Sequence, residues 1–288
     1  MARRSDGESV LHKHLRVLDA FDALHPFLTL TQIAQATGLA ASTTHRIVAE
    51  LTKEGLLERM PDREYRLGVR LWEYASRTPG AVGLREIARP WLAGVHQRVR
   101  QHTQLGVRAG TDVLFIERMS AHGAVVNATL IGGRIPLHAS ASGIVLLTGA
   151  PDETIAQAAQ PPMRRYTEHT IQDLRSLREA VRRARADGFS VTEGHIHLES
   201  RGIAVPVRGP DGSVYAALGV VVPNDHTSPM TIVEVLRVAA DAVARTLADA
   251  YRPDVAHDGR WVAGVSRRSW DYISALEPGA GRTDSVSG

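Results

Sequence analysis

The sequence predicts an α+β protein in two parts: an N-terminal winged helix-turn-helix, and a C-terminal α+β domain with a largely antiparallel sheet, joined by a linker helix. Three observations predict this fold. Residues 28–70 read as two short helices around a glycine turn, then two alternating strands with an arginine-rich tip. From Leu105 onward, short β-rich segments alternate with amphipathic helices. The length of 288 residues allows two domains with separate cores.

Shifts in pattern along the chain set the expected boundaries. The expected units are a flexible N-terminus (1–8), the winged helix (9–75), the linker helix (76–103), the second domain (104–252) and a tail (253–288). The tail ends in GAGRTDSVSG, a composition that reads as disordered.

Composition excludes several classes of protein. The chain has no cysteine, which excludes disulfides, thiolate catalysis and cysteine-based zinc sites. It has no run of about 18 apolar residues and no apolar segment near its start, so we expect no membrane span, no signal peptide and a cytoplasmic location. The net charge is only +3, so any argument for nucleic-acid binding must rest on where the cations lie.

The first helix is expected from Val10 to Leu24, ended by Pro26. Apolar residues three and four apart predict its buried face, namely Leu11, Leu15, Leu18 and Phe21.

The next two helices have recognisable start and stop signals. Thr31 is the expected N-cap of the second helix, and Gly38 supplies a turn that needs a positive φ. Ser42 is the expected cap of the third helix, which runs to about Glu54 and ends at Gly55.

At about 100° per residue, the third helix has distinct faces. Its predicted core face consists of Thr44, Ile47, Val48 and Leu51. The N-terminal residues of such a helix touch base edges in helix-turn-helix proteins. The expected DNA contacts from the helices are Thr31, Ser42, Thr43, Thr44, His45 and Arg46. Arg46 is the best candidate for a guanine contact or a phosphate clamp.

Two strands, Leu56–Arg59 and Glu64–Leu67, are expected to form a wing around the turn 60–63. The wing brings three further expected phosphate contacts together: Arg59, Arg63 and Arg66. An ordinary polar helix face is the alternative interpretation, and the wing makes it the weaker one. Nearby acidic residues dilute the positive patch, so one head should bind DNA weakly and the chain is expected to dimerise.

The sequence resembles the IclR family of bacterial transcription regulators over about residues 9–252. The matching segments are LTLTQIAQATGLAASTTHRIVAELTKEGLL, YRLGVRLWEYA, RIPLHASASGIVLL and GIAVPVRGPDGSVYAALGVVVP, in that order. The resemblance implies a winged-helix head, a linking helix and a GAF-like effector domain. It also implies a dimer or tetramer that binds palindromic operator DNA and responds to a small organic molecule, more often as a repressor.

The linker helix is expected from Val82 to His102, with a packed face of Leu84, Ile87, Ala88, Trp91, Leu92 and Val95. Further helices are expected after the loop 138–143, at 173–186, and from Ser228-Pro229 to about Tyr251. The expected strands of the second domain are GVRAG, DVLFIERM, AVVNATLI, FSVTE, GIAVPV and SVYAALGVVV.

The resemblance also locates an effector pocket. The position that is usually acidic in the family is Thr192 or Glu193 here. Gly202 stands where a Cys is usual, and Gly219 and Val221 stand where two Ser are usual. The expected effector site is Leu130, Gly133, Ala141, Ser142, Gly143, Thr192, Glu193, Gly202, Ile203, Gly219 and Val221.

Gly and Val in place of hydrogen-bonding side chains disfavour a small polar acid, since burying polar groups without partners is costly. We expect a carboxylate held by N–H groups near Ala141, Ser142 and Gly143. Its apolar or aromatic body is expected to lie toward Gly202, Gly219 and Val221. The alternative is that Gly202 and Gly219 merely pack against neighbouring backbone.

His195 and His197 form a His-x-His pair, with His169 and His226 as possible further metal ligands. Because the chain has 13 histidines, exposed or pocket-rim histidines are the preferred interpretation, and no metal or cofactor is expected.

Three functions are compatible with these patterns. A ligand-responsive regulator is preferred, with operator DNA, a small-molecule effector and a second copy of the chain as partners. An enzyme with a DNA-binding head is disfavoured because the sequence has no Gly-x-Ser-x-Gly, phosphate-loop or His-Glu-x-x-His motif. An architectural DNA binder is disfavoured by the apolar, glycine-lined second domain.

Overall fold

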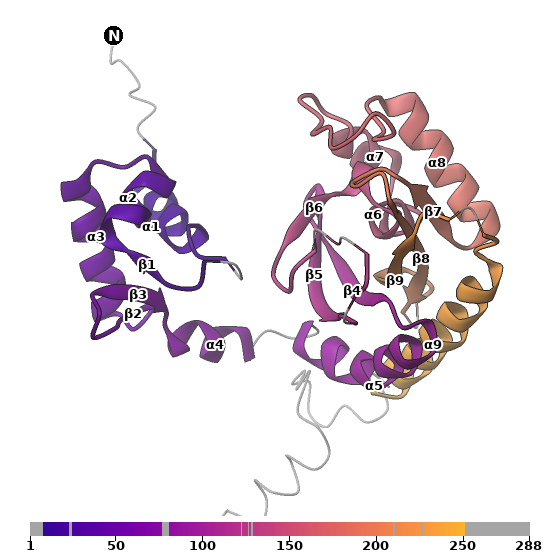
Figure 1. The fold of residues 1–288 in the computed structure, drawn as a ribbon, viewed down its shortest axis with the longest axis horizontal. Helices are drawn as coiled ribbons and strands as arrows, with labels where there is room; N and C mark the ends of the chain where they lie inside the picture. The colour runs from indigo at the N-terminus through magenta and orange to yellow at the C-terminus, as the bar shows by residue number, and fades with distance from the viewer. Residues whose placement is uncertain are drawn as a thin grey trace, which may run out of the picture.

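The computed structural model describes residues 8–22, 25–76, 81–121, 123–125, 127, 129–209, 211–225 and 227–250. It shows an N-terminal head and a larger body, with helices α4 (Val69–Ser76) and α5 (Ala81–Val99) between them (Figure 1). The expected flexible N-terminus (apart from residue 8), the tail 253–288 and His226 lie outside the described residues.

The head is a winged helix-turn-helix, as predicted. It contains α1 (Val10–Asp19), β1 (Leu28–Thr29), α2 (Leu30–Thr37), α3 (Ala41–Lys53), β2 (Leu57–Arg59) and β3 (Glu64–Leu67). Gly38 has the expected positive φ of 65°. The predicted core face of α3 is buried in full, together with Val17 and Ile33. The strand β1 was not predicted; it pairs antiparallel with β3 and completes a three-stranded sheet.

The first helix differs most from its prediction. It ends at Asp19, and its buried residue is Val17. Leu11 and Leu15 are 68% and 46% exposed. Polar contacts contribute to this placement: the Arg16 guanidinium donates to the Thr37 carbonyl, and His14 Nε2 lies 2.8 Å from Glu50 Oε2 on α3. Periodicity identified an apolar face but not which face the neighbouring helices cover.

Both predicted helix caps are wrong. Thr29 caps α2, because its side chain accepts from the Gln32 N–H while Gln32 reaches back to the Thr29 N–H. Thr31 lies inside the helix. The N-cap of α3 is Ala40, which makes no side-chain bond, so Ser42 is the second residue of its helix rather than its cap.

The body is built on a six-stranded sheet in the order β6-β5-β4-β9-β8-β7. Every pair of neighbours is antiparallel. The strands are β4 (His102–Ala109), β5 (Asp112–Met119), β6 (Arg134–Pro136), β7 (Ser190–Glu193), β8 (Ser200–Arg208) and β9 (Val214–Pro223). A turn with Gly212 at a φ of 78° joins β8 and β9.

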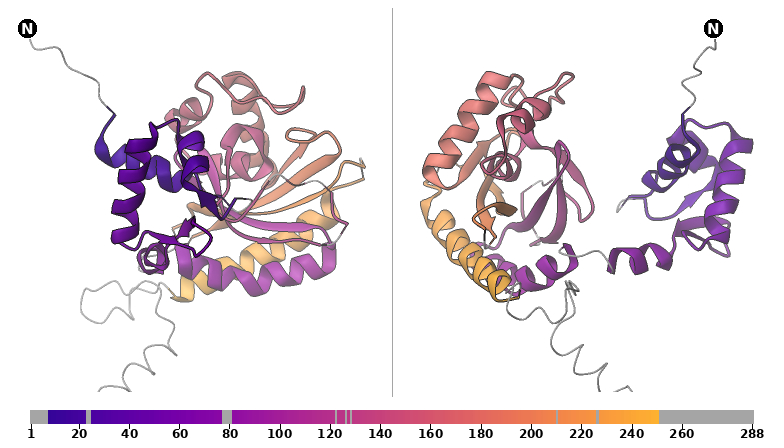
Figure 2. Two further views of the ribbon diagram at one scale, coloured as in Figure 1. Left: turned by 60° about the vertical axis from the view of Figure 1, so that its left-hand side comes forward. Right: turned by 180° about the vertical axis from the view of Figure 1, so that it is seen from behind.

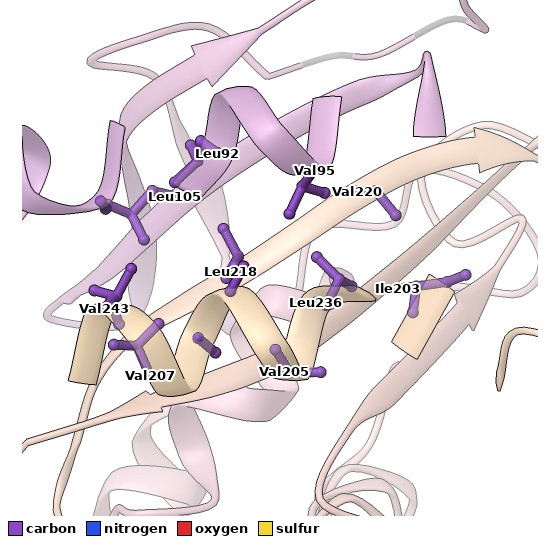
Figure 3. Close-up of a cluster of buried hydrophobic side chains, with 14 of the residues drawn as sticks. Leu92, Val95, Leu105, Ile203, Val205, Val207, Leu218, Val220, Leu236 and Val243 are labelled. Atoms are coloured by element: carbon purple, nitrogen blue, oxygen red, sulfur yellow. The ribbon is translucent and has the colours of Figure 1, made fainter. Parts of the chain in front are cut away.

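Helices cover both faces of this sheet. On one face, α5 packs beside α9 (Met230–Ala250), as the rear view in Figure 2 shows. Figure 3 shows Leu92 and Val95 of α5 and Leu236 of α9 meeting large side chains of the strands, such as Leu218. The other face carries the 3-10 turn Leu137–Ala139 and the helices α6 (Ala141–Leu147), α7 (Asp152–Ala158) and α8 (Leu174–Asp187).

Some expectations for the body fail. The described residues of AVVNATLI form no strand; Thr129 Oγ1 instead donates to Gln104 Oε1 at 2.7 Å and to Asn127 Oδ1 at 2.8 Å. Trp91 is 41% exposed, although most of the predicted face of α5 is buried. Helices α4 and α7 were not predicted. Among the described helices, none is long and apolar enough to cross a membrane.

Candidate functional sites

The outer face of α3 presents a small polar surface. Ser42, His45 and Arg46 are exposed and Thr43 is half-buried. Thr44 is different: it is fully buried, and its hydroxyl donates to the Ala40 carbonyl at 3.2 Å. Thr44 is therefore a core residue, and the prediction that it contacts DNA is wrong.

Arg46 is held beside an acidic residue on its own helix. Its Nη1 lies 3.2 Å from Glu50 Oε1. The hydrogen bond from His14, opposed by a smaller desolvation effect and helped by the charge of Arg46, holds the pKa of Glu50 below its usual value. Glu50 therefore stays ionised and offsets part of the positive charge on this face. The Arg46 side chain is 62% exposed, so it is free to turn toward a phosphate or a base.

The wing has two kinds of arginine. Arg66 makes a two-pronged ion pair across the hairpin, its Nε and Nη2 lying 2.9 and 2.7 Å from Glu58 Oε2. Arg59 and Arg63 are exposed, and among the described residues neither has an acidic partner within ion-pair distance. Arg63 adopts a φ of 67° in the turn. The cations at the tip that remain available are thus Arg59 and Arg63.

A pocket opens on the α6 face of the sheet, enclosing about 470 Å³ of space counting its open mouth. Its wall consists of Gln104, Phe115, Asn127, Thr129, Ser140, Ala141, Ser142, Thr192, His195, Ile196, Ser200, Gly202, Ile203, Val220 and Val221. Sites for organic ligands are usually lined mostly by apolar groups with a few polar ones. This pocket combines apolar walls, such as Phe115 and Val221, with eight polar residues among its fifteen.

Strand pairing builds the floor of the pocket. Thr192, Gly202 and Val221 lie on one rung, since Thr192 pairs with Gly202 and Gly202 pairs with Val221. A Cβ at Gly202 would lie 2.9 Å from Thr192 Oγ1 and 3.5 Å from the Ala141 Cβ. The missing side chain therefore lets Thr192 and the start of α6 lie close to this strand, and any side chain here would force Thr192 to shift.

Six of the expected effector residues line this pocket: Ala141, Ser142, Thr192, Gly202, Ile203 and Val221. The other five lie outside its wall: Leu130, Gly133, Gly143, Glu193 and Gly219. A Cβ at Gly219 would lie 3.1 Å from the Ile203 carbonyl, so the packing interpretation fits Gly219. Glu193 is exposed on β7, and the Gly133 N–H donates to the Leu130 carbonyl in a turn.

Gly143 has a purely structural place. Its N–H donates to Ser140 Oγ at 3.1 Å, capping α6, so this N–H is not available to a ligand. A Cβ there would meet the Leu137 carbonyl oxygen at 2.1 Å, which only glycine avoids.

Two buried polar atoms at the pocket have no partner among the described residues: Asn127 Nδ2 and His195 Nδ1. The Thr129 hydroxyl contacts both Asn127 and Gln104, a residue of β4, and this places Asn127 above β4. His195 follows β7 at the other end of the pocket. Burial, and to a lesser extent the charges of His169 and His138, lowers the pKa of His195 to about 4. Its ring is therefore neutral at pH 7.

The histidines do not gather as metal ligands. No group of three potential ligands able to hold a metal occurs within the described part of the chain. His195 lines the pocket, in agreement with the preferred interpretation.

Several pocket residues had no signal in the sequence. They are Gln104, Phe115, Asn127, Thr129, Ser140, Ile196, Ser200 and Val220. They come from six separate segments, and nothing local distinguishes them from ordinary strand and loop residues.

Comparisons with known proteins identify the family of both domains. Residues 10–61 match the model of the IclR helix-turn-helix domain, and residues 78–245 match that of the bacterial transcriptional regulator IclR C-terminal domain. The chain belongs to the IclR family. It is accordingly a transcriptional regulator with a helix-turn-helix DNA-binding domain and a C-terminal effector-binding domain.

Individual IclR relatives cover most of the chain. The regulator XynR of Escherichia coli (strain K12) is 30% identical over 210 residues, which are 72% of this chain and 83% of XynR. The Pca regulon regulatory protein of Pseudomonas putida is 27% identical over 216 residues, 73% of this chain and 72% of its own. The crystal structure of an IclR homolog from Microbacterium hydrocarbonoxydans, complexed with 4-hydroxybenzoate, is 40% identical, with a TM-score of 0.77. The match covers 84% of this chain and all of that one.

Proposed function

We propose that this regulator senses a small aromatic carboxylate with a second polar group at the far end of its ring. The observation that carries the proposal is the pair of buried, unpartnered atoms, Asn127 Nδ2 and His195 Nδ1, at opposite ends of a slot that also has apolar walls. Buried polar groups in proteins are nearly always hydrogen-bonded, so a bound ligand is the natural partner. The 4-hydroxybenzoate in the Microbacterium relative has this bipolar form.

The dimensions of the slot support one ring. Asn127 lies over β4 and His195 follows β7, with β9 and β8 between them. Neighbouring strands are about 4.8 Å apart, so these ends are about 14 Å apart at the backbone. We propose that a single six-membered ring spans the distance between the side chains that reach inward from both ends. Phe115 and Val221 supply apolar walls for that ring.

The polar contacts divide between the ends. Asn127 Nδ2 is a donor and suits a carboxylate, whereas neutral His195 can either donate or accept. The backbone N–H groups of Ala141 and Ser142, at the start of α6, lie in the same wall and add donors. Gly143 is left out, because Ser140 already uses its N–H.

The ligand proposal is tested by thermal-shift measurements with benzoate, 4-hydroxybenzoate and glyoxylate. We expect stabilisation in the order 4-hydroxybenzoate, benzoate, glyoxylate. Asn127→Asp keeps the acceptor for Thr129 but replaces the donor with a charge, so the 4-hydroxybenzoate affinity should fall at least about tenfold. Asn224→Asp, outside the pocket, is the matched control. Stabilisation by glyoxylate alone would contradict the proposal.

We further propose that the head reads operator DNA through α3 and the wing. The proposed contacts are Thr31, Ser42, Thr43, His45, Arg46, Arg59, Arg63 and Arg66, with Arg66 also holding Glu58. The operator is a palindrome, and repression is the expected polarity.

DNA-binding anisotropy with the promoter beside the gene tests this surface over a salt series. Arg46→Ala should weaken binding by about 1–3 kcal/mol if it contacts a guanine. Arg59→Ala should weaken binding to all sequences and reduce the salt slope by about one. Arg182→Ala, an exposed arginine on α8, is the control. Equal losses for all three variants would contradict the assignment.

A second copy of the chain completes the proposal. Helix α4 buries none of its residues, and Trp72 and Val69 on it are 70% and 64% exposed. Leu11 and Leu15 of α1 are exposed as well. An isolated helix of eight residues is not stable in water, so a partner surface is expected.

Sedimentation measures this assembly directly. Trp72→Glu should shift the wild-type oligomer toward monomer, whereas Trp91→Glu, on a partly exposed site of α5, is the control. A wild-type monomer at micromolar concentration would overturn the assembly proposal.

A further inference from the structure

The strand β5 contains an irregularity between the pocket and the linker helix. Leu105 of β4 pairs with Glu117, and the next residue, Gly106, pairs with Phe115. Ile116 therefore has no partner and forms a β-bulge. In a regular strand, residues two apart point to the same face; an extra residue reverses this. Phe115 and Glu117 thus point to opposite faces of the sheet.

The packing around each residue agrees. Phe115 is fully buried on the α6 face and lines the pocket. Glu117 lies opposite Leu105, whose side chain belongs to the core under α5 and α9. The bulge therefore directs the Phe115 side chain to the pocket side of the sheet and the Glu117 carboxylate to the opposite side, within three residues.

Glu117 is bound to the linker helix. Its side chain is 5% exposed, and its Oε2 lies 3.0 Å from Arg85 Nε and 3.9 Å from Arg89 Nε, both on α5. Its Oε1 accepts from the Arg118 N–H at 3.0 Å. A carboxylate this buried requires its partners, because an unpaired charge in the interior is strongly unfavourable.

Arg118, the residue after Glu117, provides a second connection between β5 and the pocket. Its guanidinium donates to the Thr129 carbonyl, and Thr129 lines the pocket. Its Nη2 also lies 3.4 Å from His102 Nδ1. Phe115, Glu117 and Arg118 of β5 thus reach the pocket wall, the linker helix and the pocket wall again, in that order.

We propose that Glu117 is a positioning residue that links the effector pocket to the linker helix through its ion pairs with Arg85 and Arg89. A shift of Phe115 or Thr129 when the pocket fills displaces the bulge and, with it, the point at which α5 is held. Because α4 connects α5 to the head, a change in the position of α5 changes how the head is placed for DNA binding. The regulatory use of this link rests on the proposed function, but the link itself does not.

Hydrogen exchange of α5 in the full-length protein tests the link without an effector or an operator. Phe115→Leu alters the pocket wall conservatively, and residues 81–99 are followed by mass spectrometry. In the wild-type background this change should raise exchange in α5 several-fold. In the Glu117→Gln background it should add little, because the carboxylate no longer holds the arginines.

Two further variants make the test specific. Asp112→Asn removes an acid from the same strand whose partner is Arg134 of β6, at 3.6 Å, and should leave the response to Phe115→Leu intact. Arg85→Gln removes the half-exposed partner of the ion pair and is expected to abolish the response. This variant serves as the test if Glu117→Gln does not fold.

The same response in the wild-type, Glu117→Gln and Arg85→Gln backgrounds would overturn the proposal, as would no response of α5 in the wild type. Failure of the proposed function looks different, since it would appear as no stabilisation by aromatic acids or no DNA binding.

Discussion

The two faces of strands β8 and β9 differ although they are made of alternate residues of the same segments. On the α5 and α9 face, large side chains such as Val205, Leu218 and Val220 form a dense core. On the α6 face, Gly202, Ala204 and Gly219 leave the sheet almost bare. The first face stabilises the domain by burying apolar area, and the second leaves room for a ligand. Neighbouring residues on one strand therefore have separate effects on stability and on binding.

Among the tests of this separation, Leu218→Ala has the largest expected effect. Leu218 is fully buried, and its truncation should lower the free energy of unfolding by about 3 kcal/mol through lost burial and a residual cavity. Chemical denaturation measures the loss. The affinity of the folded protein for 4-hydroxybenzoate should remain unchanged in calorimetry. A parallel fall in affinity would show that the two faces are coupled.

A second test concerns pH, since only the pocket face contains a buried histidine with a strongly shifted pKa. The pKa of His195 is lowered to about 4 by burial, so between pH 6.5 and 4 the unfolded chain binds more protons than the folded one. Stability from this group is full above pH 6.5 and declines as the pH falls. From pH 7.5 to 5 the loss should be about 2 kcal/mol.

The measurement compares unfolding of the wild type and His195→Gln at both pH values. The variant should lose about 2 kcal/mol less than the wild type. His45→Gln, on the exposed face of α3, is the control and should follow the wild type. Identical pH dependence of all three proteins would contradict the placement of His195 in the pocket wall.

The smallest effect on stability, and the sharpest on binding, is expected from Gly202→Ala. The new methyl group would lie 2.9 Å from Thr192 Oγ1, so Thr192 must shift, at a cost of about 1 kcal/mol. The same methyl group occupies the slot, so 4-hydroxybenzoate should lose far more affinity than glyoxylate. Equal losses for the two acids would mean that Gly202 does not contact the ring.

Much of the head was predictable because its signals are local. The faces of α3, the turn at Gly38 and the hairpin of the wing depend on residues only a few positions apart. The failures have a tertiary cause. Thr29 rather than Thr31 caps α2 because β1 pairs with β3 just before the helix, which fixes where the helix begins. Leu11 and Leu15 are exposed because α1 turns Val17 toward its neighbours.

The pocket divides in the same way. Sequence placed Ala141, Gly202 and Val221 correctly in its wall, through resemblance to a family whose sheet and first helix meet there. It did not place Asn127, and it identified His195 only as an exposed or pocket-rim histidine. The two residues lie 68 positions apart in the chain and face one slot only because β9 and β8 separate β4 from β7.

By itself, the sequence determined the class of fold, most of the helices, the turn at Gly38 and the family. The tertiary structure decided which face of α1 is covered, which arginines of the wing are already paired, and which polar atoms remain unpartnered in the pocket. It also decided the bulge that turns Glu117 toward α5. The physical reason is one of range: helix and turn preferences act over a few residues, whereas strand order and register bring together side chains that no local pattern connects.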